Sequence, residues 1–319
     1  MLNVCIAATG LYLPPRVQHS AELATLIGRS EEWILSRTGV RERRIATESM
    51  DQLAARAALE AIGDGPRPDC LINASVTPVQ LIPDSSVFIQ KALGWEQTPS
   101  WSVHATCLSF MVAMLNAAAL IQSGLYRRIL VVSAEAGTPW RNLQQPESAA
   151  LFGDGAAAAV IEKSEGDGAI LDWVMSTWPE GAELTEFRGC GTRVPPGRSD
   201  ALAEDNLFNM QGPKVFRMVL MHISRVLRTL FERNNMTFDD IDLFVLHQAS
   251  GPGMEGFVKL GFPREKIVNV VADYGNCIAA SIPMTLAIAN AQGRLRRGDR
   301  VLIGGTGAGL SIAFALVQW

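Results

Sequence analysis

The chain has 319 residues, of which 48% are hydrophobic, and a formal net charge of −4 at pH 7. This length suffices for one large or two medium cores, and the charge balance does not indicate a nucleic-acid partner. No basic start of a signal peptide precedes the first strand, and the longest apolar stretches are shorter than a membrane span. The five cysteines have neither CxxC nor cysteine–histidine ligand spacing, which argues against disulfides and a metal site. We therefore expect a cytoplasmic α/β protein without a metal ion.

The first half of the chain alternates short apolar strands with helices. We expect strands at 4–9, 69–75, 101–106, 129–133 and 156–162, and helices at 31–37, 50–62, 84–94 and 108–123. Ser30 caps the first of these helices, and Gly39 and Gly63 follow the first two as stop signals. This alternation is typical of a largely buried parallel or mixed sheet.

The second half begins with an irregular stretch at 176–212, which is rich in glycine, proline and charge. A functional loop and a plain surface excursion are equally compatible with it. An amphipathic helix is predicted over 214–234, with the cations Lys214, Arg217, Arg225 and Arg228 largely opposite its apolar face. Such a stripe is more often a solvated face than a docking site for an acidic partner. Strands at 241–246, 266–271, 300–304 and 310–317 and helices at 254–260 and 276–292 are predicted to follow.

Two stretches, 69–133 and 241–304, look like copies of one another. Each runs strand, helix, strand, long apolar helix, glycine, two arginines and strand. We interpret this as a duplicated β/α unit, with an N-terminal half at 1–165 and a C-terminal half at 166–319. Corresponding ends of the two halves would then lie against each other. Cys107, His247 and Asn276 can meet in such a fold although they are far apart in the sequence.

Cys107 and His247 are the first candidates for chemistry. Cys107 begins a long helix, where the positive helix end and nearby backbone N–H groups are expected to lower the thiol pKa. This position alone is also typical of a structural cysteine. His247 ends a very apolar strand, where α/β folds place their sites. His104, three residues before Cys107, is its rival and is equally compatible with a hydrogen-bonded core histidine.

The glycine run at 304–309 precedes a predicted strand, whereas a dinucleotide fingerprint requires a helix there. We therefore reject a nucleotide site. A glycine turn that brings backbone N–H groups close to a ligand is instead suited to an oxyanion hole.

Several motifs together resemble the β-ketoacyl-acyl-carrier-protein synthase III family of the thiolase-like superfamily. They lie at 32–45, 105–110, 151–160, 210–212, 247–249, 273–276 and 304–309, and they are colinear over the whole chain. The resemblance implies a thiolase-like fold, in which two duplicated β/α halves form a layered αβαβα arrangement. It also implies an acyltransferase that performs a decarboxylative Claisen condensation of an acyl thioester with a malonyl-type thioester.

The resemblance assigns roles to individual residues. Cys107 would be acylated, and His247 and Asn276 would donate hydrogen bonds to the second thioester. Backbone N–H groups of Cys107 and Ala308 would form the oxyanion hole. Residues implied to contact the substrate are Trp33, Arg37, Ile82 and Gly307. Coenzyme A thioesters and an acyl-carrier protein are the expected substrates and partner, no cofactor is expected, and the protein would be a homodimer.

Four departures from the family pattern point to a longer acyl chain or a secondary metabolite. Pro252 replaces an arginine that guides the carrier protein, and the stretch 145–148 lacks a second arginine that holds coenzyme A. Pro213 replaces an asparagine, and Ile82 replaces an aromatic residue at the end of the acyl pocket. We expect Ile82 and the 176–212 stretch to shape a pocket for chains longer than acetyl.

Three alternatives remain open from the sequence. The enzyme could transfer its acyl group to an alcohol or amine without forming a carbon–carbon bond. It could also condense two acyl thioesters head to head, although no acidic residue lies within 77–82 to assist that reaction. A noncatalytic partner on the same fold typically lacks the nucleophile, so the intact set of Cys107, His247 and Asn276 argues against it.

Overall fold

The computed structural model describes residues 1–166 and 168–319. Its strands are β1 (Val4–Tyr12), β2 (Arg16–His19), β3 (Glu42–Ile45), β4 (Cys70–Asn73), β5 (Ser100–Ser102), β6 (Arg128–Glu135), β7 (Gly155–Lys163), β8 (Ala169–Thr177), β9 (Thr185–Glu186), β10 (Asn209–Met210), β11 (Leu243–Leu246), β12 (Arg300–Gly307) and β13 (Ser311–Gln318). Its α-helices are α1 (Ser20–Ile27), α2 (Glu31–Thr38), α3 (Met50–Ile62), α4 (Ser85–Ala92), α5 (Ser109–Gln122), α6 (Pro146–Ala149), α7 (Gly212–Asn234), α8 (Gly251–Lys259), α9 (Val271–Tyr274) and α10 (Ser281–Ala291).

The two main sheets have the same strand order. The first sheet runs β1-β7-β6-β4-β5, and the second runs β8-β13-β12-β11. A single bridge between Phe244 and Ile267 occupies the place that β5 has in the first sheet. In the first sheet β4 lies parallel to β5 and β6, and in the second β11 lies parallel to β12. The other two strands of each sheet, β1 and β7 or β8 and β13, pair antiparallel with their neighbours. The predicted duplication is therefore confirmed, while the exact division at 165 and 166 stays a prediction.

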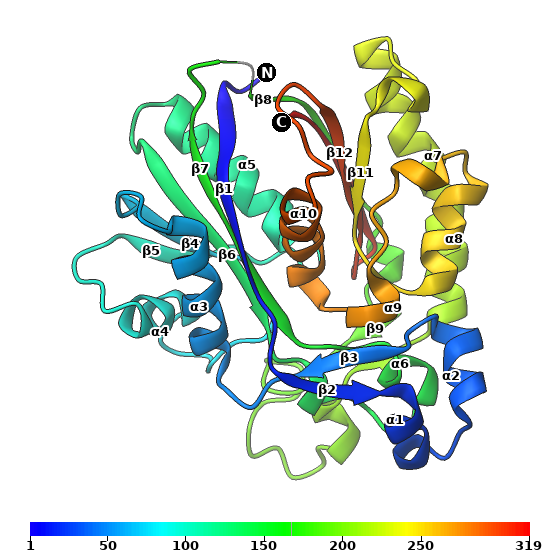
Figure 1. Cartoon of the computed structure of the whole chain (residues 1–319). Coiled ribbons are helices and arrows are strands. Elements are labelled where there is room, and N and C mark those ends of the chain that lie inside the picture. The colour runs from blue at the N-terminus through cyan, green and yellow to red at the C-terminus, as the bar shows by residue number, and fades with distance from the viewer. Residues whose placement is uncertain (167) are drawn as a thin grey trace.

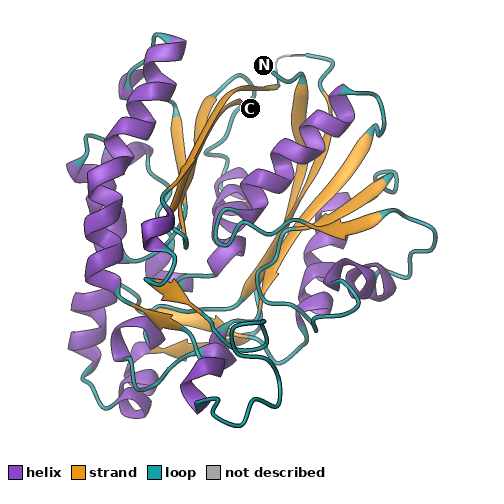
Figure 2. Ribbon diagram, turned by 180° about the vertical axis from the view of Figure 1, so that it is seen from behind, coloured by secondary structure: helices purple, strands orange, loops and turns teal. Residues whose placement is uncertain are grey.

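Five layers follow from this arrangement. Helices α5 and α10 lie between the two sheets, α3 and α4 cover the outer face of the first sheet, and α7 and α8 cover that of the second (Figures 1 and 2). The middle layer is apolar on all sides because both sheets pack on it, and Phe110 and Leu286 are fully buried there. Neighbouring residues of a central strand point into different layers, as Leu71 and Ile72 do.

A smaller group of elements lies at the end of the molecule where α5 and α10 begin. It contains the antiparallel pair β2-β3 and the helices α1, α2 and α6 (Figure 1). Gly39 ends α2 and packs directly on Gly251 at the start of α8, where an added Cβ would lie 2.8 Å from the Gly251 Cα. Two glycines thus allow α2 to approach the second half of the molecule closely.

Most predicted elements are confirmed, although several bounds are shifted, and two segments differ in kind. The strand predicted at 266–271 is wrong, because this segment contains only the single bridge at Ile267. The 176–212 stretch is less irregular than predicted, since it holds the end of β8, the short pair β9-β10 and two single-turn helices. Among the described residues, no helix is long and apolar enough to cross a membrane.

Candidate active site

Cys107 lies in a tightly fixed turn between β5 and α5. The Ser109 hydroxyl donates to the Thr106 carbonyl at 2.6 Å and accepts from the Ala105 N–H at 2.9 Å. Thr106 adopts a left-handed conformation with φ 51°, which is costly for a β-branched residue. Strand β12 passes so close that a Cβ on Gly307 would lie 2.6 Å from the Thr106 Oγ1. The position of Cys107 is therefore fixed by both halves of the chain.

The thiol of Cys107 is neutral in this environment. Cys107 is only partly exposed, and burial raises its thiol pKa to about 12, with a further contribution from the nearby charge of Glu135. The backbone N–H groups of Ala308 and of Cys107 itself act in the opposite direction and favour the thiolate. The prediction of a lowered pKa is therefore wrong in its net direction, because loss of solvation outweighs these backbone donors.

His247 follows the last residue of β11 and is buried. Its N–H donates to the Gly304 carbonyl at 2.9 Å, which ties it to β12. A side chain on Gly305 would meet the His247 Cβ at 2.6 Å, so glycine is required beside the histidine. Burial lowers the His247 pKa to about 4, and the imidazole is neutral at pH 7. Its Nδ1 is buried and has no hydrogen-bond partner among the described residues.

Gln248 joins the end of β11 to the segment that leads to Asn276. Its Nε2 donates to the Leu246 carbonyl at 2.8 Å and to the Val268 carbonyl at 3.1 Å. Its Oε1 accepts from the Val270 N–H at 3.0 Å. All three bonds are buried or partly buried, so this amide holds the backbone beside His247 in place. The His-Gln-Ala motif thus contains a structural residue, Gln248, next to the candidate catalytic residue His247.

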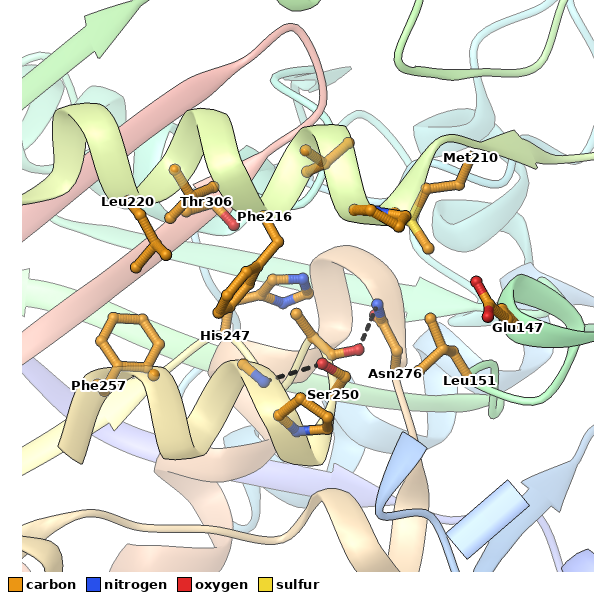
Figure 3. A pocket seen from close by; sticks show the side chains of 18 of the residues that line it. Glu147, Leu151, Met210, Phe216, Leu220, His247, Ser250, Phe257, Asn276 and Thr306 are labelled. Carbon is orange, nitrogen blue, oxygen red and sulfur yellow. Dashed lines mark hydrogen bonds between the residues drawn. The ribbon is translucent and has the colours of Figure 1, made fainter. Parts of the chain in front are cut away.

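The side chain of Asn276 has a fixed orientation. Its Nδ2 donates to the Ala249 carbonyl at 3.3 Å (Figure 3). Its Oδ1 accepts from the Ile278 N–H at 2.8 Å. Because an amide nitrogen carries two hydrogens, one remains available to donate to a ligand. The bond from the Ile278 N–H therefore occupies the amide oxygen and leaves an N–H of Asn276 to meet a ligand.

Two loops cross at Asn276. Its N–H donates to the Leu151 carbonyl at 2.8 Å, and its carbonyl accepts from the Gly153 N–H at 3.2 Å. A Cβ on Gly153 would lie 2.1 Å from the Tyr274 carbonyl oxygen, and one on Gly275 would lie 2.5 Å from the Leu151 carbonyl oxygen. These contacts explain the glycines of the Phe-Gly-Asp-Gly and Tyr-Gly-Asn motifs. The first half of the chain thereby positions a residue of the second.

Glu135 is a residue near the site that we did not predict. It ends β6, is fully buried, and accepts from the N–H groups of Val76 at 2.7 Å and Thr77 at 3.0 Å. Burial raises its carboxyl pKa to about 7, although these backbone donors and the N–H of Ala279 oppose the shift. An acidic residue at the end of an apolar strand was the signal for it in the sequence.

His247 and Asn276 line a cavity of about 470 Å³ between α7 and α8 (Figure 3). Other residues of its wall come from the second half of the chain, from α2 and α6 and from the loop after α6: Ser36, Arg37, Glu147, Leu151, Met210, Gly212, Pro213, Val215, Phe216, Val219, Leu220, Ile223, Ala249, Ser250, Pro252, Gly253, Gly256, Phe257, Leu260 and Thr306. Its volume lies in the usual range for small-molecule sites. Thr306 belongs to the same strand as Gly307, so the cavity reaches the backbone that packs on Thr106.

The remaining predicted residues lie at varying distances from this cavity. Arg37 lines its α2 side, and Trp33 lies on the same helix with the Arg29 guanidinium 5.5 Å from its ring centre. Ile82 is 84% exposed and does not line the cavity. His104 is exposed and lies outside the cavity too. The roles of these residues, and of Gly307 and Ala308, stay predictions.

No group of three or more histidine, cysteine or acidic side chains that could hold a metal ion is found within 1–166 and 168–319. The candidate site combines the imidazole of His247 and the amide of Asn276, both in the cavity wall, with the thiol of Cys107, which is not among the cavity-lining residues. This set can form a covalent thioester and stabilise a negatively charged oxygen.

Comparison with known proteins places the chain among condensing enzymes. Two family models match it: 3-oxoacyl-[acyl-carrier-protein] synthase III over residues 102–179 and the C-terminal model of the same family over residues 231–319. It is 37% identical to the β-ketoacyl-[acyl-carrier-protein] synthase III of Sinorhizobium medicae and 35% identical to that of Allorhizobium ampelinum, in both cases over 100% of each chain. The crystal structure of 3-oxoacyl-[acyl-carrier-protein] synthase III from Aquifex aeolicus superposes with a TM-score of 0.89 at 30% identity, covering 99% of this chain and 100% of that one.

Proposed function

The chain belongs to the β-ketoacyl-acyl-carrier-protein synthase III family and is an acyltransferase of that type, and from this premise we propose how its residues perform the reaction. The activity is a decarboxylative Claisen condensation of an acyl thioester with a malonyl-type thioester. The thiolase-like fold supplies the frame for it. The observation that carries the proposal is the fixed amide of Asn276 beside the neutral imidazole of His247 in one cavity wall.

In the first half-reaction, the Cys107 sulfur attacks the carbonyl carbon of an acyl thioester. A carbon–sulfur bond forms to Cys107, the bond to the donor sulfur breaks, and the donor thiol leaves with the proton that Cys107 loses. Backbone N–H groups of Cys107 and Ala308 stabilise the oxyanion between these steps, each contributing about 3 kcal/mol. The same two groups already favour a negative charge on the Cys107 sulfur in the free protein.

In the second half-reaction, His247 and Asn276 both donate to the carbonyl oxygen of the malonyl-type thioester. Its carboxylate leaves as carbon dioxide, and the electron pair of the broken bond passes into an enolate. The enolate carbon attacks the acyl group on Cys107, and the Cys107 thiolate leaves. Two neutral donors suit this step because the enolate charge forms in a buried place where a permanent opposite charge would be costly.

Substrate contacts extend the proposal beyond the reacting atoms. Arg37 and Trp33 on α2 bind the nucleotide end of coenzyme A at the open side of the cavity, and Gly307 keeps its backbone close to the thioester. An acyl-carrier protein delivers the second thioester, as the family assignment implies. No cofactor takes part, and we propose a homodimer in the cytoplasm as the working form.

The two half-reactions can be tested separately with Asn276→Ala. This variant should still be acylated at Cys107, because an amide takes no part in thioester exchange. It should lose malonyl decarboxylation by roughly 10² or more, the scale for one oxyanion donor. Intact-protein mass reports the first step, and release of labelled carbon dioxide reports the second. His247→Ala should behave similarly, with acylation partly retained.

Asn290→Ala is the matched control, since Asn290 lies at the exposed end of α10 and bonds to the Thr9 hydroxyl. It should leave both steps unchanged. The condensation proposal fails if the wild-type protein releases no carbon dioxide from any malonyl thioester and produces esters or amides instead. Acylation mapped to a cysteine other than Cys107 would remove Cys107 as the nucleophile.

A further inference from the structure

The cavity has two arms that meet at the catalytic donors. Figure 3 shows His247 and Asn276 between Glu147 on one side and Leu220 and Phe257 on the other. The first arm contains polar and charged groups, including Arg37, and is bordered by α2 and α6. The second arm runs between α7 and α8. A thioester carbonyl held by the two donors would thus have room on both sides.

The second arm is apolar, and we call it the α7–α8 groove. Its side chains are Phe216, Val219, Leu220, Ile223, Phe257 and Leu260. Phe216 and Leu220 are 42% and 44% exposed, although they belong to the apolar face of α7. Exposed apolar surface of this kind is costly in water, at about 25 cal/mol per Å². The groove therefore favours an apolar ligand that covers these side chains.

The floor of the groove is open because α8 carries glycine there. Gly256 is buried, and an added Cβ would meet only the Phe216 ring, at 3.5 Å, an ordinary contact distance. Glycine is disfavoured inside a helix by roughly 1 kcal/mol relative to alanine, and neither a positive φ nor a backbone clash requires it here. A larger side chain would occupy the groove. The glycine thus keeps space free beside the catalytic cavity.

We propose that the α7–α8 groove binds the alkyl chain of a thioester substrate whose reacting carbonyl lies at His247 and Asn276. The position of that carbonyl rests on the proposed function, whereas the apolar character of the groove does not. From Phe216 to Ile223 the groove follows α7 for seven helical rises, or about 10 Å. This length suits a medium-chain acyl group. The chain could belong to the acyl donor or to the second thioester.

Binding without chemistry tests the groove first. Cys107→Ala, which cannot be acylated, should bind decanoyl-coenzyme A at least about 50-fold more tightly than acetyl-coenzyme A, because burial of only three methylene groups corresponds to that factor. Adding Gly256→Leu should reduce this preference by about tenfold or more. Lys259→Leu adds the same side chain at an exposed position of α8 outside the cavity and should leave the preference unchanged. Calorimetric titration gives the affinities.

A second variant guards against a folding defect in Gly256→Leu. Leu220→Asp puts a carboxylate into the groove from a partly exposed position of α7 and should reduce the preference equally. Circular dichroism and the melting temperature check that both variants are folded. The proposal is overturned if Cys107→Ala binds both thioesters equally, or if the preference for the long chain survives both groove variants.

Kinetics then identify which thioester carries the chain. If it is the acyl donor, Gly256→Leu lowers the ratio of decanoyl to acetyl acylation rates at Cys107. If it is the second thioester, that ratio stays at its wild-type value, and condensation with a long-chain second substrate falls relative to malonyl. The binding experiment needs no turnover. It therefore tests whether the α7–α8 groove binds an alkyl chain even if the wild-type protein does not condense its substrates and the proposed function fails.

Discussion

Glu135 and His247 are two buried titratable residues near the site, and burial disfavours the charged form of each. It raises the Glu135 pKa to about 7 and lowers the His247 pKa to about 4. The two shifts have opposite consequences for stability. Glu135 stabilises the fold below its unfolded pKa near 4.5, and this contribution is lost as the pH rises to about 7. His247 contributes stability above its unfolded pKa near 6.5, and this is lost as the pH falls to about 4.

The opposing contributions should nearly cancel between about pH 4.5 and 6.5, and single variants should separate them. In Glu135→Gln, the free energy of unfolding should rise with pH across this window, by up to about 1.4 kcal/mol per unit. In His247→Asn it should instead fall with pH. Urea midpoints at several pH values measure these slopes. Identical slopes in the wild type and both variants would contradict the assigned shifts.

At this scale, the sequence was informative about residue identity and less so about ionisation. The Ala-Thr-Cys, His-Gln-Ala and Tyr-Gly-Asn motifs led to the three residues of the proposed mechanism. The predicted direction of the Cys107 pKa shift was wrong. A helix start can be recognised in a sequence, whereas burial of the thiol and its proximity to Glu135 cannot. Both depend on contacts between distant segments, which residue spacing alone does not give.

Among the elements, helices with strong apolar periodicity were predicted well, and short segments held by tertiary contacts were not. Helices α3, α5 and α7 begin and end within two residues of their predicted positions. The start of α8 was placed too late, because Gly251, Pro252 and Gly253 have low helix propensity and contact with α2 compensates for it. The 266–271 segment is apolar because it packs between layers, and not because it forms a strand.

The crossing of the 151–153 loop with the Asn276 segment should be sensitive to a single methyl group. Gly153→Ala places a Cβ against the Tyr274 carbonyl oxygen, so one of the two loops must move. We expect a loss of about 2 kcal/mol or more in the free energy of unfolding. Decarboxylation should suffer more than acylation of Cys107, since Asn276 loses its backbone partner.

Gly191→Ala is the control for this substitution, because an added Cβ there has open space and the backbone is not left-handed. Urea unfolding and the two half-reactions are measured for both variants. If Gly153→Ala has no larger effect than Gly191→Ala, the two loops can move apart without cost and the glycine at the crossing is not required.

The four cations of α7, Lys214, Arg217, Arg225 and Arg228, are exposed, and none forms an ion pair within the described part of the chain. Carrier proteins are acidic, so these cations should speed their encounter with the enzyme. The double charge reversal Arg217→Glu and Arg225→Glu should raise the KM for carrier-bound substrate on the order of tenfold at low salt. Acylation by a coenzyme A thioester should not change.

Salt dependence and a second charge reversal separate docking from general charge effects. The difference from the wild type should shrink at high ionic strength, where screening weakens exposed charges. Arg127→Glu with Arg296→Glu changes the net charge equally at two exposed positions away from α7 and should leave the KM unchanged. Equal effects of both double variants would remove the α7 cations from the docking surface.

Over the whole molecule, duplication was the feature most accessible from the sequence. A repeated order of elements predicts two similar sheets, and sheets that each bury both faces require helices between and outside them. The layered arrangement follows from that requirement. The sequence does not predict which surface would meet another copy of the chain. An apolar segment that is exposed has the same sequence pattern as one that is buried.

The loop before α4 is the best candidate for a contact between two copies. Leu81 and Ile82 are 63% and 84% exposed, and β5, which packs with α4, is an edge strand of the first sheet. We predict a mass of twice 34.5 kDa in light scattering for the wild type and a shift toward the monomer for Ile82→Glu. Leu26→Glu, at an equally apolar exposed position of α1, should remain dimeric. A monomeric wild type would refute the prediction.

The halves of this molecule depend on each other for the orientation of their reactive groups. The sulfur of Cys107 receives the N–H of Ala308 from the second half, and Asn276 is bound at its backbone by Leu151 and Gly153 from the first. An ancestor with one β/α unit would therefore have had to pair with a second copy to align any reactive group at all. After gene fusion, either copy could lose the groups that the other supplied. Such mutual dependence makes the fusion difficult to reverse, since a separated half would retain reactive side chains without the backbone that orients them.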